Sequence, residues 1–183
     1  MKPLRENNPL RRWLAGLVES SFQEDVGLSN PDLLDYIADL LTEFIHMERI
    51  SQLCDGSGRT VEDVAAMLSV ASSPPIVANT ERQRELHRHI GDYTLFWTGV
   101  YPENLKRMHH RQARDGLLDY FEQGKYSYAI ASRLSTPDTT PPASVLQRLS
   151  EDFEYCVYGL GLVRKGWEQA GGTGPTPGEL LQP

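Results

Sequence analysis

Cysteine is scarce in this sequence: Cys54 and Cys156 are the only two among 183 residues. A small secreted domain that depends on disulfides needs more cysteines at short spacings. Structural zinc sites built on Cys-x-x-Cys pairs need neighbouring thiols, and these two lie far apart in the chain. We therefore expect two free thiols, a reducing environment and a cytoplasmic location.

Long apolar runs are also missing. A transmembrane helix needs about 20 consecutive apolar residues, and no stretch of the sequence approaches that length. The first residues hold Arg11 and Arg12 before a short amphipathic segment, with no apolar run of the length that a signal peptide has. The sequence thus predicts no membrane partner, no membrane span and no signal peptide.

Positive charge is in the minority, because 18 Lys and Arg residues stand against 25 Asp and Glu residues, for a net charge of -7 at pH 7. Phosphate binding needs a basic face, so a general nucleic-acid-binding function is disfavoured. One basic run is present, and it would suit an anion or an acidic partner: Lys106, Arg107, His109, His110 and Arg111. Alternatively, Lys106 and Arg107 complement the C-terminus of a short helix after Pro102.

Common motifs for catalysis and for cofactor binding do not occur. The sequence contains no P-loop, no His-Glu-x-x-His, no paired Cys-x-x-Cys and no Gly-x-Ser-x-Gly. Gly159 and Gly161 lie inside an apolar helical pattern rather than after a strand, so they form no dinucleotide fingerprint. These absences favour a non-catalytic protein without a cofactor.

A di-iron site in a helical bundle would need two inward-facing Glu-x-x-His pairs. The sequence contains one such pair, Glu43 and His46. Helical spacing places both residues on an acidic face that we assign to solvent, together with Asp32, Asp35 and Asp39. We therefore expect no bound metal.

What the sequence does contain is helical periodicity along most of its length, without the alternation of a strand. This predicts an all-α fold, a single-domain bundle of about six helices over residues 1–170, followed by a flexible Gly/Pro-rich tail at residues 171–183. A Pro-rich linker at 135–142 and a helix end at Gly124 divide the second half. The main helices are expected over 9–24, 31–49, 61–70, 80–100, 111–122, 125–134 and 143–168.

The helix at about 80–100 is expected to be the buried centre of the bundle. Its apolar stripe repeats at steps of three and four residues, and Leu95 on the far side makes the C-terminal half apolar nearly all round. Gly91 and Gly99 each cost about 1 kcal/mol of helix propensity, which indicates close packing against a neighbour. The stripe consists of Leu86, Ile90, Tyr93, Trp97 and Val100.

A polar stripe follows the same helix, with Glu85, His89 and Asp92 at i, i+4 and i+7. Carboxylates near a histidine would raise its pKa and make it a general base or the start of a metal site. The alternatives are ordinary helix-stabilising contacts and hydrogen bonds to the hydroxyls of buried tyrosines. In a ligand pocket beside this helix, Tyr93 and Trp97 would form the apolar wall.

Two segments of the chain share a pattern with known sequences. Residues His89 to Glu103 read HIGDYTLFWTGVYPE, and residues Asp119 to Ala131 read DYFEQGKYSYAIA. Together they resemble a group of uncharacterised bacterial proteins in which a G-D-x-x-L-F-x-x-G-x-x-P-E segment precedes a Y-F/Y-x-x-G-x-x-x-Y segment. The resemblance implies a helical fold and a bacterial origin, and it implies no activity.

Three functions remain open, of which anion or nucleic-acid binding through the basic run from Lys106 to Arg114 is the least favoured. The favoured one is a non-catalytic helical protein that acts through a protein partner or through self-association as a homo-oligomer. The alternative is a small-ligand-binding protein or enzyme with a pocket beside the central helix, lined by Glu85, His89 and Asp92. A sizeable pocket beside that helix favours the second, and a large exposed apolar face favours the first.

Overall fold

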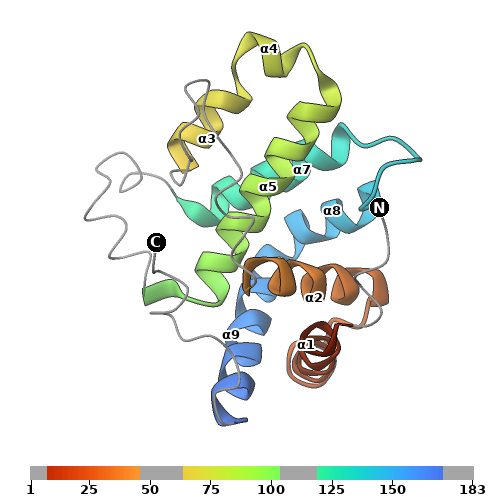
Figure 1. The fold of residues 1–183 in the computed structure, drawn as a ribbon, viewed down its shortest axis with the longest axis vertical. Coiled ribbons are helices and arrows are strands. Elements are labelled where there is room, and N and C mark those ends of the chain that lie inside the picture. The colour runs from red at the N-terminus through yellow and green to blue at the C-terminus, as the bar shows by residue number, and fades with distance from the viewer. Residues whose placement is uncertain (1–7, 46–63, 104–118, 171–183) are drawn as a thin grey trace.

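The computed structural model describes residues 8–45, 64–103 and 119–170 (Figure 1). Within these ranges the chain forms eight α-helices and one π-helix, and no strand. The all-α prediction is therefore confirmed. The Gly/Pro-rich tail at 171–183 and the basic run from Lys106 to Arg111 lie outside the described residues, and so does His46.

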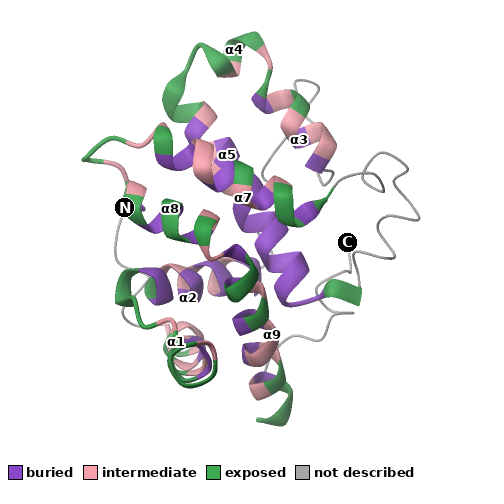
Figure 2. Ribbon diagram, turned by 180° about the vertical axis from the view of Figure 1, so that it is seen from behind, coloured by how far each residue is buried: buried purple, intermediate pink, exposed green. Residues whose placement is uncertain are grey.

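Helix α5, Thr80–Gly99, runs through the centre of the molecule (Figure 1). It begins where the side chain of Asn79 accepts a hydrogen bond of 3.0 Å from the backbone N–H of Arg82, which satisfies a donor that the first turn leaves open. Every residue from Ile90 to Val100 is buried (Figure 2). The expectation of a central helix with an apolar C-terminal half is confirmed.

Helix α7, Tyr120–Arg133, packs along α5, and glycines allow the close approach. A Cβ atom at Gly91 would lie 2.7 Å from ring carbons of Tyr128 on α7. At Gly99 it would lie 2.7 Å from Leu160 of helix α9, Phe153–Gln169. Both glycines of α5 therefore serve close packing, as the sequence indicates.

Gly124 was expected to end a helix, and this prediction is wrong. Helix α7 continues through it to Arg133. A Cβ atom at Gly124 would lie 2.4 Å from the ring of Phe153 and 2.6 Å from the hydroxyl of Thr94. The glycine is needed for the contact between α7, α5 and α9, and the tertiary packing outweighs its low helix propensity.

The N-terminal helices lie side by side below α5 (Figure 1). Helix α1, Pro9–Ser20, continues into a π-helical turn, Ser21–Val26, which ends at Gly27 with φ 80°. Helix α2, Pro31–Ile45, begins where Asn30 accepts a hydrogen bond of 3.0 Å from the N–H of Leu33. The start at Asn30-Pro31 agrees with the sequence prediction, whereas the π-helical turn was not expected.

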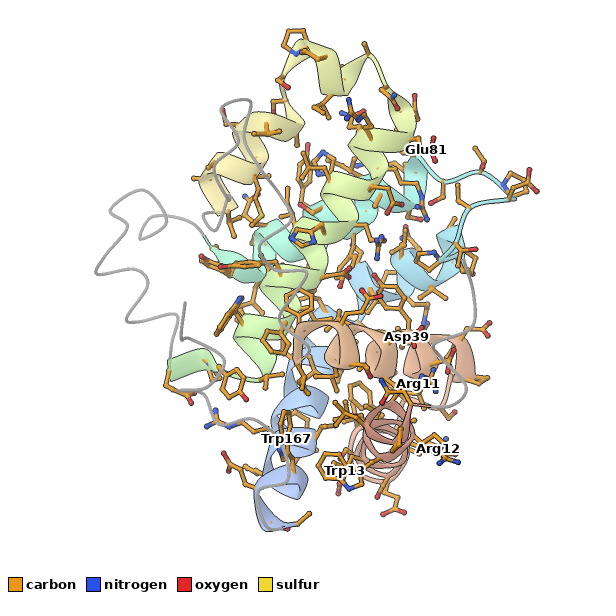
Figure 3. All side chains as sticks on the ribbon, viewed as in Figure 1. Arg11, Arg12, Trp13, Asp39, Glu81 and Trp167 are labelled. Atoms are coloured by element: carbon orange, nitrogen blue, oxygen red, sulfur yellow. The ribbon has the colours of Figure 1, made fainter. Side chains whose placement is uncertain are left out.

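Two short helices precede α5: α3, Val64–Ala71, and α4, Pro74–Val77. At the other end, the single helix expected over 143–168 is two helices, α8, Ala143–Glu151, and α9. The break is at Asp152, which has φ -102° and ψ 23°. Buried positions recur at helical spacing on both sides of it, so periodicity alone could not reveal the break. Trp167 of α9 meets Trp13 of α1 edge-on at 6.2 Å (Figure 3).

Candidate ligand-binding cleft

A buried carboxylate, Asp92, joins three helices. Its Oδ1 accepts hydrogen bonds from the hydroxyl of Tyr36 on α2 at 2.5 Å and from the hydroxyl of Tyr128 on α7 at 2.8 Å. Its Oδ2 accepts a bond of 3.2 Å from Nη1 of Arg88, one turn earlier on α5. Both oxygens are therefore engaged, as a buried carboxylate requires.

The electrostatics of this group follow from its burial. Burial raises the pKa of the Asp92 carboxyl to about 6, against the lowering effect of Arg88 and of the two tyrosine hydroxyls. Burial opposes the charge of Arg88, but Asp92, Tyr36 and Glu85 hold the pKa of its guanidinium above the ordinary value. Burial and the charge of Asp92 raise the pKa of both tyrosines well above 10, so their hydroxyls act as hydrogen-bond donors.

The ion pairs continue along α5 toward its N-terminus. Glu85 Oε2 accepts hydrogen bonds from Arg88 Nε at 3.1 Å and Nη2 at 2.9 Å. Its other oxygen pairs with Arg84. The charges alternate along one side of the helix in the order Arg84, Glu85, Arg88 and Asp92.

A cleft of about 400 Å³ opens beside this row. Helix α2 forms one wall, and the segment that leads into α8 forms the other. Arg88 and Asp92 of α5 lie at its base. The remaining lining residues are Asp32, Asp35, Tyr36, Asp39, Leu40, Glu43, Thr140, Pro141, Pro142 and Val145.

The α2 wall is strongly acidic. Asp35 and Asp39 are both paired with Arg11 of α1, which bonds Asp39 through Nε at 3.1 Å (Figure 3). This acidic face was expected to lie in solvent, and the expectation is wrong in part: Asp35 is exposed, but the Asp39 side chain is only 13% exposed. The physical reason is tertiary packing: α1 and the segment before α8 lie next to this side of α2. Helical spacing within α2 cannot show that they do.

Of the predicted polar stripe, Glu85 and Asp92 belong to one network, joined through Arg88. His89 lies apart from it and does not line the cleft. Its ring stacks on Phe44 of α2 at 6.3 Å, and its Nε2 is buried without a hydrogen-bond partner among the described residues. Burial, with the charge of Arg88, lowers the pKa of His89 to about 4, so the ring is neutral near pH 7.

The predicted apolar wall lies in the core rather than at the cleft. Tyr93 and Trp97 are 1% and 4% exposed, and neither lines the cleft. Their rings are 6.1 Å apart, and Trp97 also meets Phe96 edge-on at 5.4 Å. The two residues support α5 from the side of the core.

Sequence reasoning missed Arg88 and Tyr36. Arg88 could have been found from its position, because it is three residues from Glu85 and four from Asp92. Tyr36 lies at helical spacing within the acidic face of α2, next to Asp32 and Asp39. The second wall, Thr140 to Pro142, could not have been found, because only tertiary packing brings it opposite α2.

Two further findings concern the described residues alone. They contain no group of three or more His, Cys, Asp or Glu side chains that is suited to hold a metal ion. None of their helices is both long enough and apolar enough to cross a membrane.

No protein-family model, no curated protein sequence and no solved structure matches the chain.

Proposed function

We propose that the protein binds a small organic cation in the cleft beside α5. The observation that carries this proposal is the charge around the cleft: five carboxylates line it, against Arg88 in the lining and Arg11 of α1, which pairs with two of them from outside the lining. Arg88 is already committed to Glu85 and Asp92. A cleft with this excess of negative charge attracts positively charged ligands and repels anions.

The shape and composition of the cleft suit an amine or amidine with a short apolar body. A volume of about 400 Å³ lies in the range of small-molecule sites. Carboxylates on α2 would accept hydrogen bonds from the cationic group. Leu40, Pro142 and Val145 would contact the apolar part of the ligand.

The same geometry favours binding without catalysis. A general base or a nucleophile needs a free lone pair that the substrate can reach. Asp92 Oδ1 accepts hydrogen bonds from both tyrosines and Oδ2 accepts one from Arg88. The side chain is only 7% exposed, so a substrate could reach little of this carboxylate. We place this binding in the cytoplasm of a bacterium, a location supported by the cysteine content and an origin supported by the sequence resemblance.

The test is calorimetric titration of the full chain with two cations and their uncharged counterparts. 1,4-Diaminobutane is compared with 1,4-butanediol, and benzamidine with benzamide. Each cation is expected to bind more tightly than its counterpart, and its affinity should fall as salt screens the carboxylates. If neither cation binds more tightly than its counterpart, the proposal is wrong.

A matched pair of variants locates the binding. Asp32→Asn and Glu43→Gln each remove one lining carboxylate, and each should weaken cation binding by roughly two- to fivefold, the range of partly exposed ion pairs. Glu81→Gln removes an exposed carboxylate at the start of α5 that does not line the cleft (Figure 3), and it should leave the affinity unchanged. An equal loss in the Glu81 variant would mean that the cations respond only to net charge.

A second candidate function is a role in protein–protein interaction or self-association, and a specific observation favours it. Tyr126 on α7 and Tyr155 and Tyr158 on α9 are 57%, 60% and 58% exposed. Tyrosine is enriched where proteins bind one another. Sedimentation over a range of concentrations tests self-association, which replacement of Tyr155 and Tyr158 by serine should weaken.

A further inference from the structure

Arg84 is almost fully buried, with 3% of its side chain exposed, although it is only the fifth residue of α5. Its Nε donates a hydrogen bond of 2.7 Å to the hydroxyl of Ser135, and its Nη2 donates one of 2.7 Å to the carbonyl of Pro141. Its Nη1 pairs with Glu85. A buried guanidinium is costly unless its donors are used, and here all three nitrogens are used.

These two hydrogen bonds hold both ends of one segment. Ser135 comes just after α7, and Pro141 is a buried residue just before α8. Arg84 thus fastens the beginning and the end of the connection between the two helices to the central helix. The end of this connection, Thr140 to Pro142, is the second wall of the cleft.

A second contact holds the same connection from α7. The Ser132 hydroxyl donates a hydrogen bond of 2.8 Å to the carbonyl of Ala143. This bond lies on the α8 side of the wall and involves neither Pro141 nor α5. The hydrogen bonds from Arg84 tie this wall to α5, the helix that carries Asp92 at the base of the cleft.

We propose that Arg84 is a positioning residue for the cleft, which sets the separation of the 140–142 wall from α2 and thereby the width of cation that fits. The inference depends on the proposed cation-binding function. Arg84 does not line the cleft, so it acts through Pro141 and not by contact with the ligand. Glu85 pairs with both Arg84 and Arg88. The same row of charged residues on α5 therefore holds the 140–142 wall and forms the base of the cleft.

The experiment uses Arg84→Met, which keeps the unbranched apolar stem as far as the position of Nε and removes all the donors of the guanidinium. Arg82→Met is the matched control, because Arg82 lies on the same helix with an exposed side chain. Hydrogen exchange over residues 134–146 reports whether the wall is held. Calorimetry with 1,4-diaminobutane and benzamidine reports the ratio of affinities for a narrow and a wide cation, which general destabilisation would not change.

In Arg84→Met, exchange over 134–146 should accelerate roughly tenfold or more, because two hydrogen bonds from a charged group are lost. The ratio of the two affinities should change by roughly threefold or more, and Arg82→Met should change neither quantity. Arg84→Lys keeps the charge and can make one or two of the three contacts, so both quantities should lie between those of the parent and those of the methionine variant. It also replaces the methionine variant if that variant does not fold.

The possible failures are distinguishable. Unchanged exchange in the Arg84 variants would overturn the inference, whether or not the cations bind. Faster exchange with an unchanged affinity ratio would show that Arg84 stabilises the connection without setting the width of the cleft, which also overturns it. If neither cation binds the parent protein, the proposed function fails, and exchange alone then decides whether Arg84 holds the wall.

Discussion

The hydroxyl of Tyr128 donates a hydrogen bond of 2.8 Å to Asp92 Oδ1, while the ring of the same tyrosine lies against the backbone at Gly91. One side chain of α7 therefore makes both a polar and a steric contact with two consecutive residues of α5. These residues belong to the two segments that carry the sequence resemblance. The two segments therefore lie on the two sides of the interface between α5 and α7.

The first prediction concerns this hydrogen bond. Tyr128→Phe keeps the ring against Gly91 but removes one of three donors to a buried carboxylate, which should cost about 1–3 kcal/mol in the free energy of unfolding. Tyr126→Phe is the control, because Tyr126 is 57% exposed on the same helix, and it should cost almost nothing. Urea unfolding of both variants measures the difference. Equal values would show that the Asp92 network contributes no stability through Tyr128.

The second prediction compares one substitution at two glycines. Gly124→Ala should destabilise the protein by roughly 1–3 kcal/mol, because the new methyl group overlaps the ring of Phe153. Gly16→Ala should stabilise it by about 0.5–1 kcal/mol, because Gly16 is exposed within α1 and nothing lies within 4 Å of the added atom. Thermal unfolding should therefore shift in opposite directions. A gain in stability at Gly124 would contradict the close contact between α7 and α9.

Much of the fold could be predicted because the signals are local. The buried stripe of α5 and the cap at Asn30 each depend on residues within a few positions of one another. The continuation of α7 through Gly124 depends on contacts with α5 and α9, and there the tertiary contact prevails over the low helix propensity of glycine. The break at Asp152 could not be predicted because buried positions recur at helical spacing on both sides of it.

The candidate site was predicted only in part, because some of its residues are related by local spacing and others only by tertiary packing. Glu85 and Asp92 could be identified because they share one side of a single helix. The cleft needs α2, α5 and the residues before α8 together, and no spacing in the sequence relates Tyr36 to Pro141. His89 shares the side of the polar stripe, but its neighbour Phe44 comes from another helix, and that contact turns its half-buried ring away from the cleft.

The third prediction concerns the core. Trp97→Ala should cost roughly 3–5 kcal/mol in the free energy of unfolding, because Trp97 is 4% exposed and packs against the rings of Tyr93 and Phe96. Tyr158→Ala removes an aromatic ring that is 58% exposed, and it should cost far less. Urea unfolding distinguishes the two. A loss below about 1 kcal/mol for Trp97→Ala would contradict the central position of α5.

The fourth prediction is that two buried groups on α5 give stability opposite dependences on pH. The pKa of His89 is lowered from 6.5 to about 4, so the unfolded chain takes up a proton first, and the stability that His89 contributes is lost as pH falls from 6.5 to 4. The pKa of Asp92 is raised from 3.8 to about 6, so the folded protein takes up a proton first. The contribution of Asp92 is therefore gained as pH falls from 6 to 4.

Single variants should separate the two effects. His89→Phe keeps a ring stacked on Phe44 and removes the titration, so stability relative to the parent should rise as pH falls from 6.5 to 4. Asp92→Asn keeps the shape of the side chain and removes the opposite titration, so relative stability should fall over the same range. Each difference should reach about 3 kcal/mol at most, since one pKa unit corresponds to about 1.4 kcal/mol. Urea unfolding at pH 4.5, 5.5 and 6.5 measures how the unfolding free energy of each variant, relative to the parent, changes with pH. All other titratable groups are shared with the parent. Changes of the same sign in the two variants would show that one of these groups is not buried as the structure places it.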